Sequence, residues 1–327
     1  MTALDQFADV VGPSACLTEP NDIEPYSLDW RGNFNARPAA VVKPASTDEV
    51  ARVLAVARAA DLAVVPAGGR TGLCGGAVAL ANGPASIVLS LERLNRIRDV
   101  DAQDFSIVAE AGCVVQAVQQ AAADAGRLFP IQWGAQGTAQ IGGMLSTNAG
   151  GIRTLSWGNA RELVLGLEVV LPDGRILDDL RRVRKDNSGY ALRHLFIGAE
   201  GTLGIITAAA LRLAPELKRV ETAFLAVPSP DAALELYGRF RESGADLIGF
   251  ELAARHSMDL ANRFGPVKVP LPLEAPWYVM AEIAAAHPSV PLREMMEETL
   301  GTAMEAGEVL DAVLAESEQQ RLSIWKI

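Results

Sequence analysis

The sequence of 327 residues predicts an α+β protein built from two parts. Residues 39–110 alternate short apolar runs with an amphipathic stretch, and residues 137–210 place glycine-rich loops around short apolar runs. After Pro215 the pattern resets to apolar runs interleaved with helical stretches. Half of the residues are hydrophobic, which is enough for a large core. We expect a domain of about 180 residues followed by a smaller sheet-and-helix domain.

The first part begins with a βαβ unit. Residues 39–44, AAVVKP, predict a strand. The stretch 46–62 opens with Ser46 or Thr47 as an N-cap, carries acids in its first turn and repeats apolar residues at helical spacing. The next strand, AVVPAGG at 63–69, leads directly into a glycine loop. Further along we expect strands in 85–97 and 104–112, a helix over 114–126 ending at Gly126, and a Pro172-Asp173-Gly174 hairpin turn.

The second part predicts a sheet with helices. We expect strands at 220–227, 277–285 and 308–315 and helices at 229–244, 251–265, 292–307 and 316–327.

Charge and composition exclude several classes of protein. The net charge of −11 disfavours nucleic acid as a partner. The N-terminus lacks a cationic region followed by an apolar one, so it does not read as a signal peptide, and we expect a cytoplasmic protein. The cysteines Cys16, Cys74 and Cys113 form no CxxC pair and predict small buried thiols. The three histidines are scattered, so no metal site is predicted.

The stretch VVPAGGRTGLCGG, Val64 to Gly76, has the composition of a phosphate-binding loop. A Walker loop needs GK followed by Ser or Thr, which the chain lacks. A dinucleotide fingerprint needs GxGxxG at the start of a regular helix, which this spacing does not match. A loop of inward-facing main-chain amides remains, with Arg70 and Thr71 as additional donors; the alternative is a tight turn.

A second glycine cluster lies at Gly134–Asn159, where seven glycines alternate with Thr138, Ser146, Thr147 and Asn148. Such a backbone can approach a flat ligand closely and offer it donors. Two such loops in one domain indicate a large, elongated cofactor with a pyrophosphate at one end.

The motifs resemble a known family. PAGGRTGLCGG, VAEAGCVVQAV, LFPIQWGAQGTAQIGGMLSTNAGGIRTLSWGN, LEVVLPDGRIL and KDNSGYALRHLFIGAEGTLGIIT occur in the order typical of the vanillyl-alcohol-oxidase (PCMH) type of FAD-binding domain. The chain is most similar to the D-2-hydroxyacid dehydrogenase branch, which includes D-lactate and D-2-hydroxyglutarate dehydrogenases and the glycolate oxidase flavoprotein subunit. YSLDWRG at Tyr26–Gly32 matches the lead-in of that branch.

The resemblance implies a lead-in at 1–36, a two-subdomain FAD-binding domain at 37–215, and a ferredoxin-like substrate or cap domain at 216–327, expected to be incomplete. It also implies the cofactor-binding residues. For any one glycine among them, the alternative is a turn that needs positive φ. The implied residues are Pro66, Gly68, Gly69, Arg70, Thr71, Gly72, Leu73, Gly137, Thr138, Ile141, Gly142, Gly143, Thr147, Asn148, Gly150, Gly151, Glu200, Gly201, Gly204, Ile205 and Ile206.

The resemblance further implies the chemistry. A D-2-hydroxyacid would give a hydride to flavin N5 and become a 2-oxoacid, and the electrons would pass to a separate protein, quinone or oxygen. The first histidine is His194, so we expect the FAD to be held without a covalent bond. The catalytic base, the arginine that would bind the substrate carboxylate and any divalent metal are expected beyond the end of this chain.

Three further expectations complete the interpretation. We expect the chain by itself to hold FAD partly but not to turn over substrate. A non-catalytic FAD-binding subunit and another flavin reductase of this fold are the alternatives, and the expected partners include a second copy of the chain in a homodimer.

Overall fold

The computed structural model describes residues 1–327 and divides into two compact units. The first comprises Met1–Gly150 and Asn159–Ala214, and the second Gly151–Gly158 and Pro215–Ile327. The short segment at 151–158 therefore leaves the first unit, joins the second and returns.

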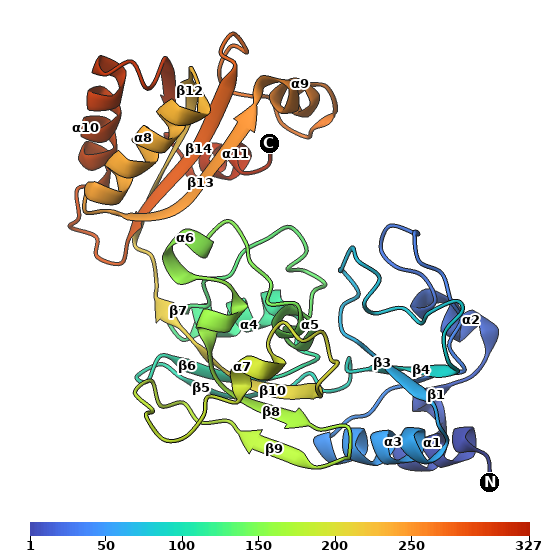
Figure 1. Cartoon of the computed structure of the whole chain (residues 1–327). Coiled ribbons are helices and arrows are strands. Elements are labelled where there is room, and N and C mark those ends of the chain that lie inside the picture. The colour runs from blue at the N-terminus through green and yellow to red at the C-terminus, as the bar shows by residue number, and fades with distance from the viewer. The chain divides into compact units, whose positions relative to one another are not determined.

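The first half of unit 1 is a four-stranded sheet in the order β1-β2-β4-β3. Strands β2, β4 and β3 are parallel, and β1 joins antiparallel, so the predicted βαβ unit is confirmed. Helix α3 packs beside α1, as Figure 1 shows. The elements are α1 (Ala3–Val11), η1 (Pro13–Ala15), β1 (Cys16–Leu17), α2 (Pro20–Ile23), η2 (Glu24–Tyr26), β2 (Ala40–Val42), α3 (Thr47–Ala59), β3 (Ala63–Ala67) and β4 (Ser86–Ser90).

Local chemistry accounts for α3. The Ser46 side chain accepts a hydrogen bond from the Glu49 amide at 3.2 Å, and Glu49 in turn accepts from the Ala45 amide at 2.7 Å. These bonds satisfy amides that the first turn leaves free. The helix then buries Val50 and Val53 against the sheet in the core of this half. The next strand, β3, ends at Ala67, where the glycine loop begins.

The second half of unit 1 is an antiparallel sheet of five strands in the order β5-β6-β10-β8-β9. The predicted Pro172–Gly174 hairpin joins β8 to β9. The elements are β5 (Ile97–Asp101), β6 (Ser106–Glu110), α4 (Val115–Asp124), β7 (Arg127–Leu128), α5 (Ile141–Ser146), η3 (Ala160–Leu163), β8 (Val164–Val170), β9 (Ile176–Asp179), α7 (Arg193–Phe196) and β10 (Ile205–Arg212).

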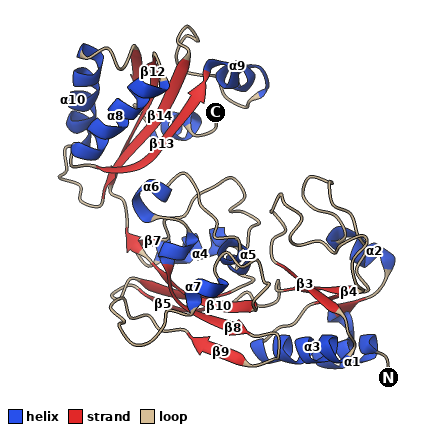
Figure 2. Cartoon of the chain, in the orientation of Figure 1, coloured by secondary structure: helices blue, strands red, loops and turns tan.

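Unit 2 is an antiparallel sheet in the order β13-β14-β12-β15, which with α8 and α10 gives the expected ferredoxin-like arrangement. Figure 2 shows α8 and α10 lying along the sheet. The elements are α6 (Thr154–Trp157), β11 (Ala214–Pro215, where unit 1 ends), β12 (Arg219–Val227), α8 (Pro230–Glu242), β13 (Asp246–Ala254), α9 (Arg255–Phe264), β14 (Trp277–Ala285), α10 (Leu292–Glu305), β15 (Asp311–Leu314) and α11 (Glu318–Ile324).

Strand β12 buries both of its faces. Ala223, Leu225 and Val227 point to the core formed with α8 and α10. Phe224 and Ala226 point to the other face, where Met258 of α9 and Ile324 of α11 pack. Because side chains alternate along a strand, this apolar run places helices on both faces of the sheet.

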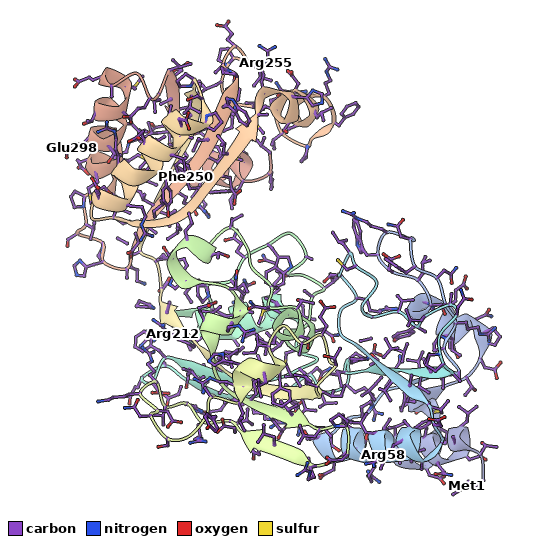
Figure 3. The ribbon with its side chains drawn as sticks, viewed as in Figure 1. Met1, Arg58, Arg212, Phe250, Arg255 and Glu298 are labelled. Carbon is purple, nitrogen blue, oxygen red and sulfur yellow. The ribbon has the colours of Figure 1, made fainter.

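Two predictions on secondary structure were wrong. The helix expected over 251–265 begins only at Arg255, because Glu251–Ala254 continue β13 and pair with β14. Figure 3 labels both Phe250 on that strand and Arg255 at the helix start. Pairing in the sheet overrides the helical preference of this stretch. In addition, the region expected as loops and strands around 137–159 contains the short helices α5 and α6.

Candidate functional site

The first wall of the candidate site is the loop that follows β3, Gly68–Gly76. The Leu91 amide donates to the Ala67 carbonyl at 3.1 Å, which fixes the point where the loop leaves the sheet. Arg70 adopts φ +52°, a conformation that side-chain-bearing residues rarely take, and Gly75 adopts φ +75°. The loop is therefore sharply folded.

The second wall is the glycine cluster around α5, and it touches the first loop directly. A Cβ at Gly69 would lie 2.0 Å from the Thr138 carbonyl oxygen. A Cβ at Gly68 would lie 3.4 Å from the Gly143 amide nitrogen. Glycine is required at Gly69 because the two backbones approach closely there. The two glycine clusters predicted to share one ligand thus lie side by side.

The third wall is the segment Gly198–Ile206, which leads into β10. The Gly198 amide donates to the Leu145 carbonyl at 3.0 Å, and the Glu200 amide donates to the Ser146 carbonyl at 2.9 Å. These bonds attach the segment to α5. Gly201, at φ +78°, lies against Pro66 at the end of β3, where a Cβ would fall 2.4 Å from the proline ring. All three predicted segments therefore meet.

Between them lies a cavity of about 450 Å³. Pockets of this size are typical of sites for small molecules and parts of cofactors. Its wall is formed by Pro66, Ala67, Gly68, Gly69, Arg70, Thr71, Gly72, Leu73, Cys74, Gly76, Ala77, Leu91, Trp133, Ala139, Gln140, Gly142, Gly143, Met144, Ser146, Thr147, Ala149, Glu200, Gly201, Gly204, Ile205 and Ile206.

Most of the residues predicted to bind the cofactor are on this wall; the others are not. Ile141 is fully buried in the core. The Asn148 side chain accepts a hydrogen bond from the Arg161 amide at 2.9 Å, which directs it toward η3. Gly151 belongs to unit 2. Their roles, and those of the other residues off the wall, stay predictions. The residues off the wall are Gly137, Thr138, Ile141, Asn148, Gly150 and Gly151.

Sequence reasoning missed several wall residues. Trp133, Gln140 and Met144 flank or lie within the second glycine cluster, so their position between glycines was the available signal. Leu91 reaches the wall because it follows β4, the strand that pairs with β3. No local pattern marks it.

The expectation that all three cysteines are buried was wrong. Cys16 and Cys113 are buried, but Cys74 is exposed. Cys74 lies in the glycine loop two residues before Gly76, and glycine neighbours provide no side chains to cover it. Burial raises the pKa of the Cys113 thiol to about 11, so that cysteine is inert as a nucleophile.

A largely buried ionic network joins strands of the five-stranded sheet of unit 1 and links that sheet to α3. Arg98 donates to Glu168 at 3.0 Å and to Glu110 at 3.2 Å. Glu168 also accepts from Thr207 at 2.8 Å and from Thr47, the first residue of α3, at 2.6 Å. Burial acts to raise the pKa of Glu168, but these hydrogen bonds outweigh it and the pKa is lowered. The carboxylate is therefore charged in the folded protein.

The cavity fits FAD in three respects. Glycines at Gly68, Gly69 and Gly72 leave main-chain amides free of side-chain cover, as a pyrophosphate requires. On the opposite wall the Gln140 side-chain oxygen is buried and has no hydrogen-bond partner within the protein. A buried acceptor without a donor is costly, and the hydroxyl and NH groups of FAD would supply one. Apolar side chains of Ile205, Ile206 and Met144 suit a flavin ring.

Family models match both units. Residues 38–179 match the FAD binding domain, and residues 216–327 match the C-terminal domain of FAD linked oxidases. The chain therefore combines an FAD-binding domain with the C-terminal domain type of FAD-linked oxidases.

Two relatives narrow the class. The chain is 40% identical over 310 residues to a D-2-hydroxyglutarate dehydrogenase of Xanthomonas citri pv. viticola. This alignment covers 95% of the chain and 64% of the relative. It is 35% identical over 327 residues to the D-2-hydroxyglutarate dehydrogenase of Stutzerimonas stutzeri. This second alignment covers 99% of the chain and 68% of the relative. The chain belongs to the family of FAD-linked D-2-hydroxyacid dehydrogenases. It spans about two thirds of the length of these two relatives.

A solved structure supports the same fold. The crystal structure of p-cresol methylhydroxylase with substrate bound superposes with a TM-score of 0.72 at 14% identity, over 99% of this chain and 68% of that one. The expected PCMH-type fold with a C-terminal domain is confirmed. The match of residues 38–179 to the FAD binding domain gives FAD as the cofactor of the first domain. Within the chain, no helix is both long and apolar enough to cross a membrane.

Proposed function

We propose that the protein oxidises a D-2-hydroxyacid to the 2-oxoacid with FAD, and that this chain supplies the FAD site and a substrate or cap domain. The observation that carries the proposal is the single cavity enclosed by all three predicted cofactor segments. FAD, when bound, supplies the hydride acceptor.

The residues of this chain would bind and orient the cofactor. The amides of Gly68–Leu73 are available to the pyrophosphate, and Gln140 is available to a donor of the flavin or ribityl chain. Ile205, Ile206 and Met144 would exclude water from the ring. The wall contains no histidine, and Cys74 is part of the loop assigned to the pyrophosphate, so we propose that FAD is bound without a covalent bond.

The substrate is proposed from the relatives. Both are named for D-2-hydroxyglutarate, which makes this acid the first candidate, before D-lactate and glycolate. A separate protein, a quinone or oxygen would accept the electrons. Cytoplasmic location and a homodimer remain predictions.

A non-catalytic FAD-binding subunit is the second candidate, because the titratable side chains on the cavity wall are Arg70, Cys74 and Glu200 only. Histidine, the side chain that most often acts as a general base, is not among them.

The test is to express the full-length natural protein and screen D- and L-2-hydroxyacids with an artificial dye as electron acceptor. We expect reduction of the dye with a D-acid, first of all D-2-hydroxyglutarate. FAD binding without reduction by any acid would favour the non-catalytic subunit. Reduction by L-acids alone would contradict the proposed substrate class.

A further inference from the structure

The segment Tyr26–Phe34, which carries the YSLDWRG motif, has no role in the site described above. We call it the lead-in segment. It precedes β2 and contacts the glycine loop Gly68–Gly76 at two places, Arg70 and Gly75.

At one end Tyr26 holds Arg70. The Arg70 guanidinium lies over the Tyr26 ring, 4.2 Å from its centroid, and donates a hydrogen bond to the Pro25 carbonyl. A guanidinium is attracted to the face of an aromatic ring, and its planar shape suits stacking. The side chain of Arg70 therefore interacts with the lead-in segment, whereas its own backbone adopts the rare positive φ.

Tyr26 is itself held in place by Glu92 and Lys43. Its ring is buried, and its hydroxyl donates to Glu92 at 2.9 Å. Glu92 also accepts from Ser90, the last residue of β4, at 3.1 Å and pairs with Lys43 at 2.7 Å. The Lys43 ammonium lies 5.2 Å from the centroid of the same ring. The platform under Arg70 is thus anchored to the parallel sheet.

At the other end Phe34 covers Gly75. The buried Asp29 carboxylate accepts from the Phe34 amide at 2.8 Å and from the Arg31 amide at 3.3 Å, which closes a turn. This turn places the Phe34 ring where a Cβ on Gly75 would lie 2.6 Å from it. Between these two contacts the loop presents Gly72 and Leu73 to the cavity.

We propose that Tyr26 is a positioning residue for the FAD pyrophosphate. It holds Arg70 in its left-handed conformation, and this fixes the direction of the neighbouring amides toward the cavity. The Arg70 side chain then acts as a clamp, which means that it fixes the glycine loop to the lead-in segment, and its guanidinium does not contact the FAD phosphate. This inference rests on the proposed FAD site. It assigns the lead-in segment a function that its sequence alone did not suggest.

The first test measures the FAD dissociation constant by quenching of flavin fluorescence with the apoprotein. Tyr26→Leu removes the ring, and we expect binding about tenfold weaker, since a partly desolvated cation–π contact is worth roughly that factor. Tyr26→Phe keeps the ring and loses only the hydroxyl, and should restore affinity to within about threefold. Tyr190→Leu, at a tyrosine that is 93% exposed, is the matched control and should bind as the wild type does.

The second test separates a clamp from a direct phosphate contact. Arg70 is partly exposed in its loop, so Arg70→Ala tests the clamp without removing a core side chain. It should weaken FAD binding about as much as Tyr26→Leu, and the double variant should be no weaker than either single one. The dependence of affinity on KCl concentration should be the same for wild type and Arg70→Ala.

Two outcomes would contradict the role of Tyr26, and a third would contradict the proposed function. If Arg70→Ala weakens binding and flattens the salt dependence while Tyr26→Leu binds normally, Arg70 contacts the phosphate and the inference is wrong. If Tyr26→Phe binds as poorly as Tyr26→Leu, the ring does not provide the clamp. If the wild-type apoprotein does not bind FAD, the proposed function fails instead.

Discussion

The contact between Gly69 and the Thr138 carbonyl gives a sharp test of how the two glycine loops are joined. In Gly69→Ala the new methyl carbon would lie 2.0 Å from that oxygen and 2.9 Å from both the Thr138 carbonyl carbon and the Ala139 Cα. All three are backbone atoms, so rotation of a side chain cannot relieve the overlap. The two loops must move apart.

The cost follows from the size of that overlap. Overpacking a tight contact costs about 1–3 kcal/mol and occasionally more, and backbone neighbours place this case at about 3 kcal/mol. A domain of this size loses about 2–4 °C in melting temperature per kcal/mol. We therefore expect unit 1 of the Gly69→Ala apoprotein to melt about 6–12 °C below that of the wild type, as measured by differential scanning calorimetry.

Gly72→Ala is the matched control in the same loop. Its added methyl would meet nothing within 4 Å, and its φ is not in the left-handed range. The apoprotein of this variant should melt within about 1 °C of the wild type. Because Gly72 lies on the cavity wall, FAD affinity should nevertheless fall. Equal melting temperatures for Gly69→Ala and wild type would refute the close approach of the two loops.

Three further predictions concern acid stability, thiol reactivity and cofactor release. The pKa values of Glu110 and Glu168 are lowered, because hydrogen bonds from Arg96 and Arg98 outweigh burial. The free energy of unfolding should therefore decline as pH falls below about 4.5. Glu168→Gln should make that decline shallower, as measured by urea titrations at several pH values. In the native apoprotein, a disulfide reagent should modify Cys74 rapidly and Cys16 and Cys113 only after unfolding, with FAD slowing the first reaction; equal rates for all three would contradict the burial described. FAD should leave on acid precipitation, and yellow colour retained in the washed pellet would show a covalent bond.

Local sequence patterns predict much of the fold. The strand that ends at Ala67, the helix capped by Ser46 and the hairpin at Pro172–Gly174 each depend on neighbouring residues, and each is present. The helix expected over 251–265 failed because Glu251–Ala254 pair with β14, a strand more than 20 residues further along the chain. Contacts at that separation leave no local pattern.

The residues of the candidate site likewise fall into those that local sequence patterns predict and those that they do not. The glycine segments could be predicted because close backbone approach demands glycine itself, as at Gly69. Leu91 could not, since no local pattern distinguishes an apolar residue on a cavity wall from one in the core. The clamp of Arg70 by Tyr26 joins residues 44 positions apart and follows only from their stacking.

The FAD site proposed for unit 1 can be tested directly. The most direct measurement is titration of the apoprotein with FAD, followed by flavin fluorescence and by the absorbance of the complex after gel filtration. We expect saturable binding of one FAD per chain, weakened in Gly72→Ala and unchanged in Tyr190→Leu. Failure to bind FAD, or binding that is equal in Gly72→Ala and wild type, would contradict it.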